Sequence, residues 1–184
     1  MSEACSGGRA STGRPGAPME KAGMSPAHHL AQLNIARPRG RLDGPVMAEF
    51  MASLERINGL GEASPGFVWR LQDAGGNATA LEQPFGPDII VNLTVWQDLE
   101  SLRAFAFGGE HAAFLRRRAE WFARLPTPPS VLWWVPAGHR PALAEAKVRL
   151  DLLTGSGPTA AAFTFARAFA ADGTSARRGA GAGA

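Results

Sequence analysis

Residues 88–96 read DIIVNLTVW and form the clearest β-strand pattern in the chain. Successive side chains of a strand point to opposite faces of the sheet, so the alternation defines two faces. One face is aliphatic and consists of Ile89, Val91, Leu93 and Val95. The other face mixes hydrogen-bonding groups with large apolar ones: Ile90, Asn92, Thr94 and Trp96. This strand predicts a sheet with one core face and one face that lines a cavity.

Other segments extend the predicted sheet. Residues 28–36 (HHLAQLNIA) alternate in the same way and place Gln32 and Asn34 on a polar face. Three further runs have strand composition: 67–71 (FVWRL), 130–135 (SVLWWV) and 161–168 (AAFTFARA).

Helical periodicity separates these strands. Asp43 can cap a first helix whose apolar stripe ends near Ile57, and Asp98 can cap a second over residues 99–107. The run 110–122, EHAAFLRRRAEWF, predicts a third helix, and Pro141 begins a fourth that extends to Leu153.

The predicted order is strand, helix, strand, strand, helix and strand, followed by one more helix and strand. It favours an α+β class, the ferredoxin-like split βαβ arrangement, in which helices cover one face of an antiparallel sheet. The other face would need a cover, and a second copy of the chain could supply it. We therefore expect a homodimer, a dimeric α+β barrel whose cavity is lined by the polar strand positions.

Composition divides the 184 residues into one domain and two ends. Residues 1–27 and 171–184 are rich in small residues and poor in large apolar ones, so we expect a disordered leader and a disordered tail. The domain is predicted over residues 28–170.

Charge and motifs argue against several classes of function. The formal net charge of +3 leaves only about +1 for the predicted domain, and no basic stripe predicts a nucleic-acid partner. No apolar run predicts a membrane span or a secretion signal, so a cytoplasmic location is expected. The single cysteine, Cys5, lies in the leader, and the histidines lack the spacing of a metal site.

The helix predicted over residues 110–122 contains polar side chains that its periodicity does not explain. His111 and Arg118 fall within its apolar stripe, whereas Arg116 and Arg117 belong to the solvated side. A buried polar or charged group needs a partner, so His111 and Arg118 mark a candidate site.

Four segments resemble a bacterial family known as domain of unknown function 3291. They are GEASPGFVWRLQDAGGNA (61–78), VWQDLESLRAFAFGGEHAAFLRRRAEWF (95–122), VLWWVPAGHRP (131–141) and GPTAAAFTFARAF (157–169), and the resemblance covers about residues 30–169. It implies the dimeric α+β barrel shared with antibiotic-biosynthesis-type monooxygenases and, more distantly, with haem proteins. It implies no settled reaction.

His111 then has three interpretations. It is a structural residue hydrogen-bonded at a helix start, a general base or acid in the cavity, or an axial ligand of haem. Arg118 has two: an ion pair with Glu49, Glu55 or Glu62, or an anchor for an anionic group of a ligand.

A wider set of residues is predicted to bind the substrate through flat aromatic walls and orienting hydrogen bonds. It consists of Asn34, Trp69, Arg70, Asn92, Thr94, Trp96 and Trp133. Trp96 is favoured among the tryptophans because it shares a strand face with Asn92 and Thr94.

The leading hypothesis is a monooxygenase-like enzyme for a small hydrophobic or aromatic metabolite, with His111 and Arg118 as catalytic residues and no cofactor. The alternatives are a dimer that binds a small molecule without converting it, and a haem protein with His111 as the axial ligand.

Overall fold

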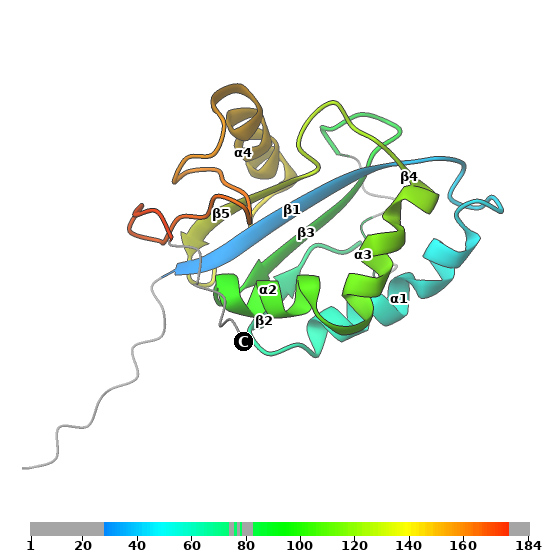
Figure 1. Cartoon of the computed structure of the whole chain (residues 1–184), viewed down its shortest axis with the longest axis horizontal. Helices are drawn as coiled ribbons and strands as arrows, with labels where there is room; N and C mark the ends of the chain where they lie inside the picture. Colours follow the sequence, from blue (N-terminus) through cyan, green and yellow to red (C-terminus); the bar gives the residue numbers. More distant parts are fainter. Residues whose placement is uncertain (1–27, 74–75, 77, 79–82, 177–184) are drawn as a thin grey trace, which may run out of the picture.

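The computed structural model describes residues 28–73, 76, 78 and 83–176 (Figure 1). Its sheet contains five strands: β1 (His28–Pro38), β2 (Phe67–Arg70), β3 (Ile90–Trp96), β4 (Phe122–Ala123) and β5 (Ser130–Pro136). The predictions for four of these strands hold to within two residues at each end.

Strand β1 lies at the centre of the sheet and pairs antiparallel with β3 on one side and β5 on the other. β2 pairs with the outer edge of β3, and the short β4 pairs with the end of β1. The four long strands therefore follow the order β2-β3-β1-β5. This order and the antiparallel pairing confirm the ferredoxin-like split βαβ fold.

Four helices connect or follow the strands: α1 (Ala48–Glu62), α2 (Leu99–Phe107), α3 (Gly109–Trp121) and α4 (Leu143–Ser156). Asp98 caps α2 as predicted, since its Oδ1 accepts a hydrogen bond from the Ser101 amide at 2.8 Å. The predicted Asp43 cap is wrong. Asp43 instead binds Arg41 through two hydrogen bonds, and α1 begins five residues later.

The sheet separates two hydrophobic clusters. The aliphatic face packs against α4, where Ala146, Leu150 and Leu153 contact a cluster that includes Leu93 and Val131. On the opposite face, one end of the sheet packs against α2 and the segment after α4. The buried residues of that second cluster are Leu30, Trp96, Leu102, Leu132, Phe163 and Ala168.

Helices therefore lie on both faces of the sheet, which differs from the sequence-based expectation of helices on one face. Figure 1 shows α1, α2 and α3 on one side and α4 on the other. The apolar stripe of α4 covers the aliphatic face within one chain, with no help from a second copy. Homodimerisation stays a prediction.

The segment after α4 contains no regular strand, in contrast to the prediction for 161–168. Phe163 forms a single antiparallel bridge with Leu132, with backbone hydrogen bonds of 2.8 and 2.9 Å. The chain then turns, and Ser175 forms a bridge with Phe169. Residues 171–176 are thus part of the fold, whereas the leader over 1–27 and the rest of the predicted tail lie outside the described residues.

Candidate functional site

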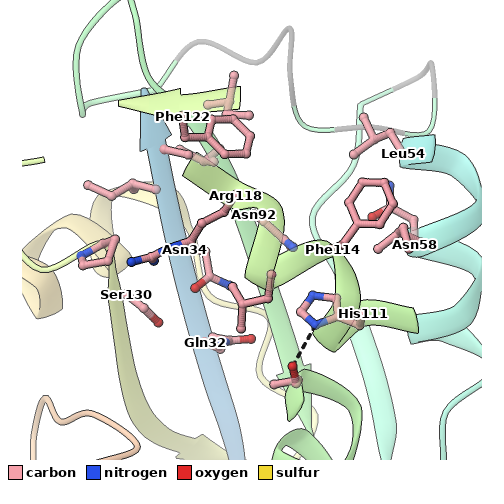
Figure 2. Close-up of a pocket in the computed structure, with 18 of the residues that line it drawn as sticks. Gln32, Asn34, Leu54, Asn58, Asn92, His111, Phe114, Arg118, Phe122 and Ser130 are labelled. Atoms are coloured by element: carbon pink, nitrogen blue, oxygen red, sulfur yellow. Dashed lines mark hydrogen bonds between the residues drawn. The ribbon is translucent and has the colours of Figure 1, made fainter. Parts of the chain in front are cut away.

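A pocket of about 390 Å³ lies between the mixed face of the sheet and the helices α1 and α3 (Figure 2). The sheet forms its floor, and the two helices form its roof. The pocket occupies the half of this face that α2 leaves uncovered. One face of the sheet is thus divided between a core under α2 and a cavity under α1 and α3.

The floor is polar and spans three strands. Asn34 on β1 is the register partner of Asn92 on β3 and of Ser130 on β5, so the three residues form a row across the sheet. Gln32 lies two residues before Asn34 on the same face. Asn92 is exposed although its strand is internal to the sheet, because the space above it is the pocket.

The roof is aromatic. Phe114 stacks on Trp121 within α3 at a centroid distance of 5.0 Å, and Phe50 of α1 meets Phe122 edge-to-face at 4.9 Å. All four rings line the cavity. Flat apolar walls above a hydrogen-bonding floor are suited to a planar organic ligand.

His111 projects into this pocket from the first turn of α3. Its Nδ1 lies 3.0 Å from the backbone oxygen of Ala106. A carbonyl oxygen can only accept a hydrogen bond, so Nδ1 carries the proton and Nε2 of the neutral ring has a free lone pair. In Figure 2 the second ring nitrogen points away from Ala106. The structure thus leaves a basic nitrogen on the pocket wall.

Burial lowers the pKa of His111 below its ordinary value of 6.5, and the hydrogen bond to Ala106 opposes this shift only in part. The ring also packs against Phe105 at 4.4 Å between centroids. His111 is therefore neutral at pH 7 and able to accept a proton.

The lowered pKa predicts a specific loss of stability in acid. Between the folded pKa and about 6.5, the unfolded chain binds a proton at His111 that the folded chain does not. The free energy of unfolding should therefore be unaffected by this group above that window and should decrease as the pH falls through it. Urea titrations at several pH values should show a smaller decrease for His111→Gln than for the parent protein, and parallel curves would contradict the assignment.

Arg116 and Arg117 of α3 are exposed as predicted, and Arg117 and Arg118 differ in their contacts. Arg117, expected on the solvated side, binds Glu49 of α1 through two hydrogen bonds of 2.6 and 2.7 Å. Arg118, expected to be buried with the apolar stripe, is exposed; it lines the pocket and forms no ion pair or hydrogen bond with a described residue. The predicted pairing of Arg118 with Glu49 is thus wrong, since Arg117 occupies that carboxylate.

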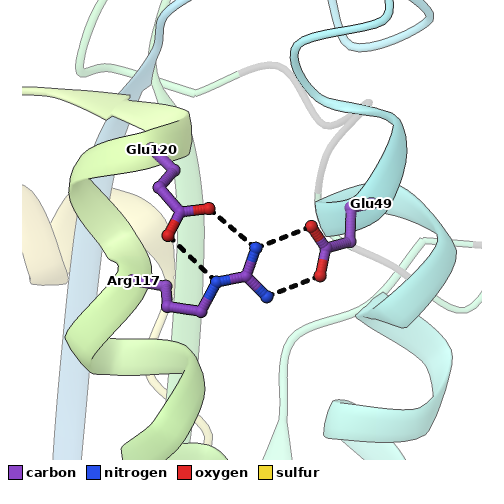
Figure 3. Close-up of polar contacts among 3 residues, drawn as sticks. All are labelled: Glu49, Arg117 and Glu120. Carbon is purple, nitrogen blue, oxygen red and sulfur yellow. Dashed lines mark hydrogen bonds and ion pairs between the residues drawn. The ribbon is translucent and has the colours of Figure 1, made fainter.

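The Arg117 interactions join the two helices of the roof (Figure 3). Its guanidinium also binds Glu120 and lies over the ring of Trp121 at 4.9 Å. These contacts lower the pKa of both the Glu49 and Glu120 carboxyl groups, because each accepts hydrogen bonds from the cation.

Breaking this link should loosen the roof without unfolding the domain. We expect Glu49→Gln to increase hydrogen exchange of the amides of α1, because it removes one of the ion pairs between α1 and α3 and leaves that of Arg56 with Glu110. Glu55→Gln is the matched control, since Glu55 lies on the same helix and has no partner among the described residues. Equal exchange in the two variants would show that the link does not hold the roof.

The charge of the pocket is positive. Arg70 lines it from β2, but Glu62 pairs with Arg70 at 2.5 Å. Arg118 has no such compensation, and no aspartate or glutamate occurs among the described lining residues. Nor does any group of three His, Cys, Asp or Glu side chains gather for a metal ion in the part of the chain that the structure describes.

Two predicted binding residues on β3 lie outside the pocket. Trp96 is only 1% exposed and stacks on Phe105 at 5.1 Å beneath α2. Its indole nitrogen donates to the hydroxyl of Thr94 at 3.0 Å, and that hydroxyl lies 3.4 Å from the side-chain oxygen of Gln32. Trp96 shares a sheet face with Asn92, as predicted. Helix α2 covers the end of that face where Trp96 lies, whereas Asn92 lies in the open half that forms the pocket.

The other two predicted tryptophans also lie outside the pocket. Trp133 is fully buried on the α4 face, where its indole nitrogen donates to Glu145 at 2.9 Å. Trp69 packs against the same aliphatic cluster.

Of all the predicted site residues, the pocket brings together Asn34, Arg70, Asn92, His111 and Arg118.

The sequence family described as a domain of unknown function (DUF3291) matches residues 29–179, a range that contains every element of the pocket. The chain belongs to this family. The match confirms the resemblance found in the sequence. Among curated proteins, none matches the DUF3291 chain.

Several solved structures are similar to the DUF3291 chain at low identity. SnoaB, a cofactor-independent oxygenase from Streptomyces nogalater, is 18% identical, with 62% of this chain and 97% of SnoaB covered and a TM-score of 0.41. The monooxygenase from the gene ActVA-Orf6 of Streptomyces coelicolor, solved with nanaomycin D, is 15% identical, with 63% and 92% covered and a TM-score of 0.35. The NE2512 protein of unknown function from Nitrosomonas europaea is 18% identical, with 63% and 97% covered and a TM-score of 0.40.

Several pocket residues of the DUF3291 chain were missed by the sequence analysis. Ser130 opens β5, and Phe107 and Phe165 lie at the rim, where their rings meet at 5.0 Å. The position of Gln32 on the polar face of the first strand was a usable signal. No pattern in the sequence indicated that the segment after α4 would reach the pocket.

Within the described residues, no helix is both long and apolar enough to cross a bilayer.

Proposed function

We propose that this protein is a monooxygenase-like enzyme that uses the pocket to deprotonate a small hydrophobic, planar metabolite. The substrate is an acidic phenol or enol, and the enzyme uses no cofactor. The observation that carries the proposal is the hydrogen bond from His111 Nδ1 to the Ala106 carbonyl, because it leaves Nε2 as a base in an apolar pocket.

His111 suits this role because it is neutral at the pH at which it must act. Burial lowers its pKa, so it exists as free base at neutral pH. The aromatic roof limits the water that would compete with the substrate for the proton.

Other pocket residues stabilise the anion that forms. The side-chain amide of Asn92 makes no hydrogen bond with a described residue and can donate to the developing oxyanion. Arg118 adds a positive charge at the other end of the same cavity, where it attracts an anionic ligand. The Asn92 donor favours the charged state over the neutral substrate, which is the requirement for catalysis.

The electron-rich anion then reacts directly with dioxygen. One oxygen atom becomes a carbonyl at the conjugated carbon that carries the reacting hydrogen, and the other leaves as water with that hydrogen and the hydroxyl proton. The substrate supplies all four electrons, so the step balances without a metal or flavin. His111 returns its proton to the departing oxygen.

The test is oxygen uptake by the purified protein with a panel of fused-ring phenols and enols, after thermal-shift screening for binding. We expect at least one ligand that both raises Tm and consumes oxygen. Ligands that saturate the pocket without oxygen uptake would contradict the reaction and support the alternative of a dimer that only binds a small molecule.

The haem alternative uses the same nitrogen. A proximal histidine binds iron through one ring nitrogen while the other donates to a carbonyl, and His111 meets that requirement. An absorption spectrum with added haemin separates the two chemistries. A stoichiometric Soret band that disappears in His111→Ala would replace the cofactor-free proposal with a haem protein.

A further inference from the structure

We propose that the pocket holds a separate carboxylate subsite, formed by Arg118 above Asn34 and Ser130, at the opposite end from His111. The inference builds on the proposed function, because it names the class of substrate that the base acts on. The ligand is a hydroxylated fused-ring aromatic acid. Its carboxylate lies at Arg118 and its acidic hydroxyl at His111.

The first argument is the charge of Arg118. Its guanidinium has five donors, none of which binds a described residue, and no carboxylate among the described lining residues neutralises it. Of the two arginines among the described lining residues, Arg70 binds Glu62, so Arg118 is the one whose charge is left for a ligand.

The second argument is a buried hydroxyl without a partner. Ser130 Oγ is inaccessible to solvent, lines the pocket and makes no hydrogen bond with any described residue. Leaving such a group unsatisfied costs about 1–3 kcal/mol, and rotation about the Cα–Cβ bond can turn this hydroxyl toward a ligand in the pocket that Ser130 lines. The side-chain amide of Asn34, the register partner of Ser130, likewise makes no hydrogen bond with a described residue. Figure 2 shows Arg118 pointing from α3 toward β1, which carries Asn34.

The third argument is the distance between the two ends. His111 and Arg118 are seven residues apart on α3, which corresponds to about 10 Å along the helix axis. The row formed by Asn92, Asn34 and Ser130 crosses three strands and spans about 10 Å at the usual strand spacing. A two-ring aromatic acid with its hydroxyl at the far end matches both lengths.

The number of charges favours a carboxylate over a phosphate. One uncompensated guanidinium balances a single negative charge, and its fork binds both oxygens of a carboxylate. A phosphate dianion would leave one charge unbalanced in a cavity with an apolar roof.

The experiment compares hydroxynaphthoic acid, with its two groups at opposite ends of the ring system, with its methyl ester. Binding is followed by titration, and naphthol absorbance reports ionisation of the hydroxyl. The parent protein should bind the acid at least tenfold more tightly than the ester. Arg118→Gln should lose this preference, while Arg116→Gln, on the same helix but outside the pocket, should keep it.

The two proposals fail in different ways. Equal affinity for acid and ester, no binding of the acid, or a preference that survives Arg118→Gln would overturn the subsite. In the parent protein the bound hydroxyl should ionise at a lower pH than the free naphthol. The variant His111→Gln should keep the preference for the acid and lose this shift in the ionisation of the hydroxyl. If the parent protein prefers the acid but never ionises it, the subsite stands and the base function fails.

Discussion

Replacing Gly66 with Ala should cause a large loss of stability. Gly66 forms the turn before β2 at φ +79°, a left-handed conformation that costs other residues about 1–2 kcal/mol. An added Cβ would lie 2.2 Å from Ser101 Oγ and 2.4 Å from Ser101 Cβ, so α2 would have to move. Overpacking of this kind adds about 1–3 kcal/mol.

A displacement of α2 would also strain the hydrogen bond of 2.7 Å that the Gly66 carbonyl accepts from the amide of Gln97, which lies just before α2. Urea unfolding should show a lower midpoint for Gly66→Ala and a free energy of unfolding lower by the sum of the two costs, about 2–5 kcal/mol. Gly138→Ala is the matched control, since Gly138 has φ +84° and nothing within 4 Å of an added Cβ. Equal losses in the two variants would mean that the contact with Ser101 is not tight.

Replacing His111 with Gln should cause the largest loss of activity. Removing a general base typically slows the chemical step about 10²–10⁴-fold. Glutamine can keep a hydrogen bond to the Ala106 carbonyl, so the loss would arise from the missing basic nitrogen and not from a changed fold. We expect kcat to fall by that factor, measured by oxygen uptake with whichever substrate the screen identifies.

The pH profile separates a base from a structural histidine. In the parent protein kcat/KM should rise with pH and reach a plateau, with its inflection below the ordinary histidine value because burial lowers the pKa of His111. His111→Gln should lack this inflection. His139→Gln is the control, because His139 binds Glu145 outside the pocket, and the same loss in that variant would show a general effect.

The fold could be predicted from the sequence because its strongest signals are local. Residues 88–96 alternate without interruption, and Asp98 caps α2 where predicted. What the sequence analysis missed was which helix covers which face. Periodicity identifies an apolar stripe on α4, but it does not say that the stripe packs on the aliphatic face of the same chain.

The site shows the same limit. The face shared by Asn92, Thr94 and Trp96 was assigned correctly, yet α2 covers only the end that carries Trp96. A strand pattern assigns a side chain to a face and cannot say where along the strand a helix ends. Arg117 and Arg118 show this for α3: adjacent residues of one type meet Glu49 in one case and an open cavity in the other.

The most direct test of the central claim is the protonation state of His111 in the free protein, measured by nitrogen NMR of the labelled imidazoles at neutral pH. The structure predicts a neutral ring with a protonated Nδ1 and an unprotonated Nε2, because Nδ1 donates to Ala106 and burial disfavours the cation. His111→Gln assigns the signal. An imidazolium, or a proton on Nε2, would contradict the claim, since His111 would then have no free base to present to a ligand.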